Sequence, residues 1–152
     1  MKVEDLYQEI ILDHYRAKHH SGLRDPFDAE VHHVNPSCGD EVTLRLQVSD
    51  GTVSDVSYES VGCSISQAST SVMSDLVIGR PVSDGLELHD TFLAMMQSTG
   101  DCEPDEDMLE DAVAFVGVAR FPARVKCALL GWSAFKDAVL RAGTPETMEA
   151  LS

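Results

Sequence analysis

The feature that most constrains the fold is a pair of alternating apolar stretches joined by a tight-turn dipeptide. Apolar and polar residues alternate over 42–48, as in a strand with one buried face. Asp50-Gly51 follows, a strong signal for a two-residue hairpin turn, and a second strand is predicted over 53–61. An earlier strand over 29–34, ended by Asn35-Pro36, completes a short three-stranded antiparallel meander.

Most of the remaining apolar residues recur at helical spacing. The predicted helices cover 3–16, the segment from Cys63 to about Gly79-Arg80-Pro81, about 88–97, 109–116, and the region from Pro122 onward, with an acidic loop over 99–107. Strands followed by helices predict an α+β fold, a three-stranded antiparallel sheet packed against a bundle of helices. The length of 152 residues predicts a single domain over 1–152.

The charge balance excludes some classes of partner. The chain has 26 acidic and 11 basic residues and a formal charge of −15 at pH 7, so we expect no binding to nucleic acid and none to anionic membranes. No apolar stretch reaches the ~20 residues of a membrane span, and the charged N-terminus does not resemble a signal peptide. We therefore expect a cytoplasmic protein, in which four cysteines indicate metal or redox chemistry rather than structural disulfides.

Three cysteines and one aspartate form the candidate site: Cys38, Asp40, Cys63 and Cys127. Three thiols and a carboxylate are a sufficient ligand set for one tetrahedral zinc ion. Each residue lies beside a predicted turn or helix start, and the flexible Gly39 would let Cys38 and Asp40 point to the same side. The alternative is that these are ordinary buried thiols, but core cysteines have no reason to favour such positions.

Other candidates are weaker. Cys102 lies among carboxylates, which disfavour a thiolate, so we expect an exposed loop thiol without a special role. Adjacent residues on a strand point to opposite faces, so a strand doublet is a poor chelate. We accordingly expect His19-His20 and His32-His33 to be solvated or hydrogen-bonded rather than bound to the metal.

Four segments resemble the iron–sulfur cluster assembly proteins of the IscU/NifU superfamily. They are Leu6-Tyr7-Gln8-Glu9-Ile10-Ile11-Leu12-Asp13-His14-Tyr15, Asn35-Pro36-Ser37-Cys38-Gly39-Asp40, Gly62-Cys63-Ser64-Ile65-Ser66 and Phe121-Pro122-Ala123-Arg124-Val125-Lys126-Cys127-Ala128. The resemblance covers nearly the whole chain in order and implies a SufE/NifU-like fold. The stretch of roughly 81–108 looks like the insertion of the SufU branch. Lys126 stands where IscU scaffolds have a histidine that takes part in metal or cluster binding.

The resemblance to SufU proteins implies a function. It implies Zn²⁺ on Cys38, Asp40, Cys63 and Cys127, with Cys38 as the thiol that accepts persulfide sulfur. It further implies a SufS-type cysteine desulfurase as partner, a histidine of which would compete for the metal, and a downstream iron–sulfur scaffold as recipient. The protein would then be a sulfurtransferase that acts with a desulfurase rather than a stand-alone enzyme.

Two basic residues lie close in sequence to the last predicted ligand. Arg124 and Lys126 could offset the negative charge of the site or contact the partner. The alternative function is a scaffold that binds iron or a nascent [2Fe–2S] cluster on the same residues. A zinc hydrolase would need an open metal position and a general base, which a closed four-ligand site does not offer.

Overall fold

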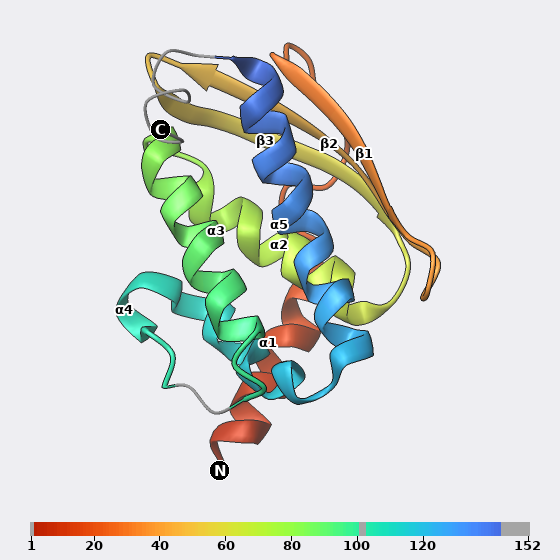
Figure 1. Ribbon diagram of the computed structural model, residues 1–152. Helices are drawn as coiled ribbons and strands as arrows, with labels where there is room; N and C mark the ends of the chain where they lie inside the picture. The colour runs from red at the N-terminus through yellow and green to blue at the C-terminus, as the bar shows by residue number, and fades with distance from the viewer. Residues whose placement is uncertain (1, 101–102, 144–152) are drawn as a thin grey trace.

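The computed structural model describes residues 2–100 and 103–143. In chain order the elements are α1 (Val3–Ala17), β1 (Ala29–Asn35), β2 (Asp40–Ser49), β3 (Thr52–Val61), α2 (Ser64–Val77), α3 (Val82–Met96), α4 (Glu106–Leu109), the 3₁₀ helix η1 (Glu110–Arg120) and α5 (Pro122–Ala142). The three strands pair antiparallel in the order β1-β2-β3. The helices gather on one face of this sheet, which confirms the predicted α+β class (Figure 1).

The predicted hairpin is present. Asp50 and Gly51 both have positive φ, 52° and 75°, as the two central residues of a type I′ turn require. The alternation in β2 places Val42, Leu44 and Leu46 on the buried face, each at most 1% exposed. This face meets α5, which runs across β1 and β2 (Figure 1).

The helical layer is held by close packing around α5. A Cβ on Gly131 would lie 2.4 Å from Thr70 Oγ1, so the two helices α5 and α2 approach each other more closely than most side chains would allow. Trp132 is fully buried and stacks on Phe92 of α3, with 4.7 Å between ring centroids. The sheet and the helices therefore share one apolar core.

Two predicted boundaries were wrong. Helix α3 begins at Val82 instead of near residue 88. Gly85 disfavours a helix in sequence, but here its missing side chain makes room for Phe135, which would lie 2.9 Å from a Cβ. The predicted acidic loop over 99–107 includes the start of α4, whose first turn is capped by the Asp105 side chain.

The helices of the described residues include none long and apolar enough to span a membrane.

Candidate metal centre

The candidate centre lies where one end of the sheet meets the N-termini of α2 and α5. Asp40 is the first residue of β2 and pairs with Asn35, the last residue of β1. Because residues two apart share a face of a strand, Asp40 lies on the same face as Val42 and Leu44. Its carboxylate therefore points towards the helical layer and is fully buried.

Cys38 lies in the turn between β1 and β2. The backbone N–H groups of Cys38 and Gly39 donate to the carbonyl of Asn35 at 3.3 and 2.9 Å, and Gly39 has φ of 71°. A left-handed residue at this position favours glycine, as the sequence predicted. Cys38 is solvent-exposed, in contrast to the buried Asp40 beside it.

Cys63 is the N-cap residue of α2 and is tied directly to Asp40. Its backbone N–H donates to Asp40 Oδ1 at 2.8 Å, and its Sγ lies 3.8 Å from Asp40 Oδ2. Gly62, with φ of 139°, makes this approach possible, since a Cβ there would lie 2.1 Å from Asp40 Oδ1. Glycine at 62 is thus required by both the backbone and the carboxylate.

Cys127 approaches the centre from the second turn of α5. It is fully buried, and its candidate ligand atom lies within 4.8 Å of those of Cys38 and Asp40. Ligands held tetrahedrally at about 2.0–2.3 Å from zinc lie roughly 3.3–3.8 Å from one another. The distance of 3.8 Å between Cys63 Sγ and Asp40 Oδ2 is close to this range. Cys63 is not among the three residues whose ligand atoms all lie within 4.8 Å, so one ion on all four groups requires the side chains to move.

Protonation couples Asp40 and Cys127. Burial alone would raise the pKa of the Asp40 carboxyl, but hydrogen bonds from the Cys127 thiol, the Cys63 backbone N–H and Ser66 outweigh it and hold this pKa below its ordinary value. Burial, followed by hydrogen bonding to Asp40, raises the pKa of the Cys127 thiol. The metal-free centre is therefore a carboxylate that accepts from a protonated thiol, and a metal that binds both as anions would displace this proton.

The two basic residues predicted to act at the site, Arg124 and Lys126, lie close to the centre in sequence, and their side chains are on the protein surface. Arg124 and Lys126, in the first turns of α5, are exposed, and neither takes part in an ion pair among the described residues. Arg124 lines a groove beside the centre together with Ile11, Ile65 and Phe121. Arg124 is thus positioned at a surface that a partner could contact.

Two further residues of the centre were not predicted. Asn35 is buried, and its Nδ2 lies 3.5 Å from Asp40 Oδ2 and 3.6 Å from Cys127 Sγ. Ser66 Oγ lies 3.9 Å from Cys63 Sγ and donates to the Cys63 carbonyl. The sequence signal for Asn35 was its place at a strand end before proline, and only the strand register shows that it lies opposite Asp40.

The other thiol and histidine predictions have different outcomes. Cys102 lies outside the described residues. His32 and His33 point to opposite faces of β1, as predicted, and His33 Nε2 lies 2.8 Å from Asp137 Oδ2. His19 and His20 are hydrogen-bonded, as expected, but to a single carboxylate, that of Asp75.

Comparison with known proteins identifies the family. The model of the NifU-like N terminal domain matches residues 6–128. The chain belongs to this family. It is 37% identical over 145 residues to the iron-sulfur cluster assembly scaffold protein IscU of Streptococcus pyogenes serotype M1, covering 95% of this chain and 89% of the relative. It is 36% identical over 141 residues to the zinc-dependent sulfurtransferase SufU of Bacillus subtilis (strain 168), covering 91% and 92%.

The fold agrees with this assignment. The crystal structure of the N-terminal part of a nitrogen-fixing NifU-like protein from Brucella abortus superposes with a TM-score of 0.83 at 28% identity, covering 92% of this chain and 96% of that one. The chain is therefore a SufU-type member of the IscU/NifU superfamily of iron–sulfur cluster assembly proteins, as its sequence motifs implied.

Proposed function

We propose that this protein is a zinc-dependent sulfurtransferase that accepts persulfide sulfur from a cysteine desulfurase for iron–sulfur cluster assembly. The proposed zinc ligands are Cys38, Asp40, Cys63 and Cys127, and Cys38 is the proposed acceptor. When bound, zinc would keep the thiols deprotonated and prevent them from pairing as disulfides.

The observation that carries the proposal is the unequal exposure of the three thiols. Cys38 is exposed on a turn, whereas Cys63 is half-buried at a helix start and Cys127 is fully buried. Thiol exchange requires that the attacking sulfur reach the other sulfur. Cys38 alone of the three combines access to solvent with a turn that can move without unwinding a helix.

The transfer step balances without an added oxidant or reductant. The Cys38 thiolate attacks the terminal sulfur of a persulfide on the desulfurase, and an S–S bond forms on Cys38. The S–S bond of the donor breaks, and its electron pair leaves with the donor cysteine as a thiolate. Cys38 then carries the persulfide, and the donor is ready for another cycle.

Exposed apolar side chains around the centre support a protein partner. Val34, Val61 and Phe121 are 48%, 65% and 60% exposed. Val34 precedes the last residue of β1, Val61 ends β3 just before α2, and Phe121 precedes the first residue of α5. Apolar residues gathered at one end of a molecule mark interaction surfaces. We assign this end, with Arg124 at its edge, to the desulfurase, which would be of the SufS type, and to the scaffold that receives the sulfur.

The alternative is a scaffold for a [2Fe–2S] cluster held by the same residues. The similarity to an IscU protein favours it. Lys126, which stands before Cys127 where the scaffolds have a histidine, favours the sulfurtransferase. The two functions differ in the metal that the purified protein carries.

The deciding experiment is persulfide mapping. Protein purified without added metal is analysed for zinc and iron, then incubated with a SufS-type desulfurase and cysteine, and its peptides are examined by mass spectrometry. We expect about one zinc on the cysteine ligands, no visible chromophore, and persulfide on Cys38. The Cys38→Ser variant should accept no sulfur, whereas Cys102→Ser, the matched control outside the motif, should accept as much as the wild type.

Two results would overturn the proposal. Persulfide on Cys63 or Cys127 with Cys38 unmodified would show that the acceptor is wrong. A brown protein that contains iron and sulfide in place of zinc would establish the scaffold function.

A further inference from the structure

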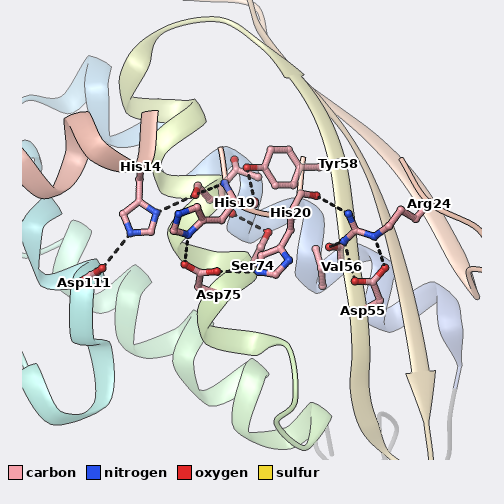
Figure 2. Close-up of polar contacts among 12 residues, drawn as sticks. His14, His19, His20, Arg24, Asp55, Val56, Tyr58, Ser74, Asp75 and Asp111 are labelled. Carbon is pink, nitrogen blue, oxygen red and sulfur yellow. Dashed lines mark hydrogen bonds and ion pairs between the residues drawn. The ribbon is translucent and has the colours of Figure 1, made fainter. Parts of the chain in front are cut away.

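A second group of potential ligands lies away from the cysteines, between the end of α1 and the end of α2. This histidine cluster consists of His14, His19, His20 and Asp75 (Figure 2). Candidate ligand atoms of His14, His19 and Asp75 lie within 4.8 Å of one another. His19 Nδ1 is 2.5 Å from Asp75 Oδ2, and His20 Nε2 is 2.8 Å from Asp75 Oδ1.

We propose that the histidine cluster binds one divalent transition-metal ion, of the class of Zn²⁺, Ni²⁺ or Cu²⁺. Two imidazoles and one carboxylate, those of His14, His19 and Asp75, lie close together, and this donor set suits such ions, whereas Mg²⁺ and Ca²⁺ require mainly oxygen ligands. His20, which is bonded to the other oxygen of Asp75, lies outside this group of three and would have to move to complete the tetrahedral coordination that zinc prefers. The proposal is independent of the sulfur-acceptor function.

Hydrogen bonds at both ring nitrogens fix the orientation of His14 in the cluster. The ring is buried, and its Nε2 lies 3.0 Å from Asp111 Oδ2 while its Nδ1 lies 2.9 Å from Ser71 Oγ. Ser71 Oγ also accepts the backbone N–H of His19 at 2.9 Å, so its own hydrogen is available for His14 Nδ1. In the neutral ring this network places the proton on Nε2 and directs the Nδ1 lone pair at the Ser71 hydroxyl, which a metal ion would have to displace.

This arrangement matches the surroundings of metal-bound histidines. Such histidines almost always donate their second ring N–H to a carboxylate or a carbonyl. Asp111 is that carboxylate for His14. The His19 ring lies beside the His14 ring, with 4.8 Å between the ring centroids (Figure 2).

The turn after α1 explains how two adjacent histidines reach one carboxylate. The doublet does not lie on a strand, because Lys18 and His20 adopt positive φ of 47° and 68°. The backbone therefore folds back, and both rings face Asp75. Tyr58 fixes this turn by donating its hydroxyl to the His19 carbonyl at 2.9 Å.

The cluster has room to adjust around an ion. Tetrahedral ligands at about 2.0–2.1 Å from a metal lie roughly 3.3 Å apart, more than the present distances from Asp75 to the two histidines. The side chains of His19, His20 and Asp75 are all about one-third to one-half exposed, so they can separate without disturbing the core.

The test is a metal titration of untagged, metal-free protein with Co²⁺ and with Zn²⁺ against a competing chelator. We expect two equivalents to bind to the wild type. One should give the thiolate charge-transfer absorption of the cysteine centre, and the other should give d–d absorption alone. Asp75→Asn and the double variant His19→Gln/His20→Gln should retain only the equivalent with thiolate absorption.

Two further variants and one measurement on the unaltered protein sharpen the test. His32→Gln, which removes an exposed histidine 3.7 Å from Glu41 and away from the cluster, should still bind two equivalents. Asp111→Asn should weaken the second equivalent about 10- to 100-fold, since it removes only the group that positions His14. In the wild-type protein, Cu²⁺ should broaden the NMR signals of His14, His19 and His20 before those of His32.

The proposal is wrong if the wild-type protein binds no equivalent that lacks thiolate absorption, or if such an equivalent persists in Asp75→Asn. Broadening of His32 before the three histidines of the cluster would likewise show adventitious surface binding. The broadening measurement needs no variant, so a folding defect in Asp75→Asn leaves the outcome clear.

Discussion

Gly62→Ala should damage both the stability and the metal affinity of the cysteine centre. The new Cβ would lie 2.1 Å from Asp40 Oδ1 and 2.9 Å from Asp40 Cα. The carboxylate cannot yield easily, because Oδ1 accepts the Cys63 backbone N–H at 2.8 Å. The variant must therefore move the carboxylate, the strand end, or both.

The magnitude follows from two contributions. A non-glycine residue held in a sparsely populated backbone region costs about 1–3 kcal/mol. Loss of the hydrogen bond from Cys63 to the buried Asp40 carboxylate adds about 1.5–3 kcal/mol. We expect a decrease of about 2.5–6 kcal/mol in the free energy of unfolding, a large share of the 5–15 kcal/mol typical of a domain.

Gly39→Ala is the matched control. Gly39 also has positive φ, 71°, but a Cβ there would meet nothing within 4 Å. This variant should lose only the backbone contribution, about 1–2 kcal/mol. Urea unfolding of the metal-free proteins, with equal slopes, measures both values, and chelator competition measures the accompanying change in zinc affinity.

The explanation also predicts coupling between Gly62 and Asp40. In the Asp40→Ala background, Gly62→Ala should cost at least about 1 kcal/mol less, because the nearest clashing atom is gone. If Gly62→Ala destabilised the protein no more than Gly39→Ala, or by the same amount with and without the Asp40 carboxylate, the steric argument would be refuted.

Two further predictions concern the core. Tyr58→Phe removes the hydrogen bond to the His19 carbonyl and should cost about 1 kcal/mol near neutral pH. Burial raises the pKa of Tyr58 to about 12 from 10.0, so the wild type should lose up to about 2 kcal/mol as pH rises through that range. Urea unfolding should then show the gap between the two proteins closing and, at the top of the range, reversing. Gly131→Ala should cost about 1–3 kcal/mol in thermal unfolding because of Thr70, whereas Gly117→Ala, with open space around it, should be nearly neutral.

The sheet could be predicted from sequence because its signals are local. The alternation of β2 and the dipeptide Asp50-Gly51 determine strand and turn without reference to the rest of the chain. The start of α3 could not be predicted in this way. Its Gly85 disfavours a helix locally and is explained only by Phe135, some fifty residues later.

The sequence could point to the segments of the candidate cysteine centre but not to the residues that support them. Turn and helix-start positions pointed to Cys38, Cys63 and Cys127, and the structure brings these segments together. The roles of Asn35 and Gly62 depend on strand register and on a close approach of two backbones. Neither can be derived from spacing along the chain.

The burial of helix α2 was the hardest feature to predict from the sequence, because most of its polar residues are buried and do not lie on a solvated face. Ser69 is buried and donates to the Ala128 carbonyl of α5 at 2.7 Å. Ser66 supports Cys63, and Ser71 supports His14. A serine-rich helix whose sequence suggests one apolar stripe is thus buried on several sides, and its hydroxyl groups bond to α1, to α5 and within the helix itself.

This helix also separates the two proposed metal sites. Cys63 precedes its first turn and Asp75 lies in its last, a rise of about 18 Å along an α-helix. Two ions at that separation share no ligand and form no binuclear centre. Filling or removing one should therefore leave the other chemically intact. We expect Asp75→Asn to accept persulfide sulfur on Cys38 like the wild type, and a loss of sulfur acceptance in a folded, zinc-loaded Asp75→Asn protein would show that the two sites are coupled through α2.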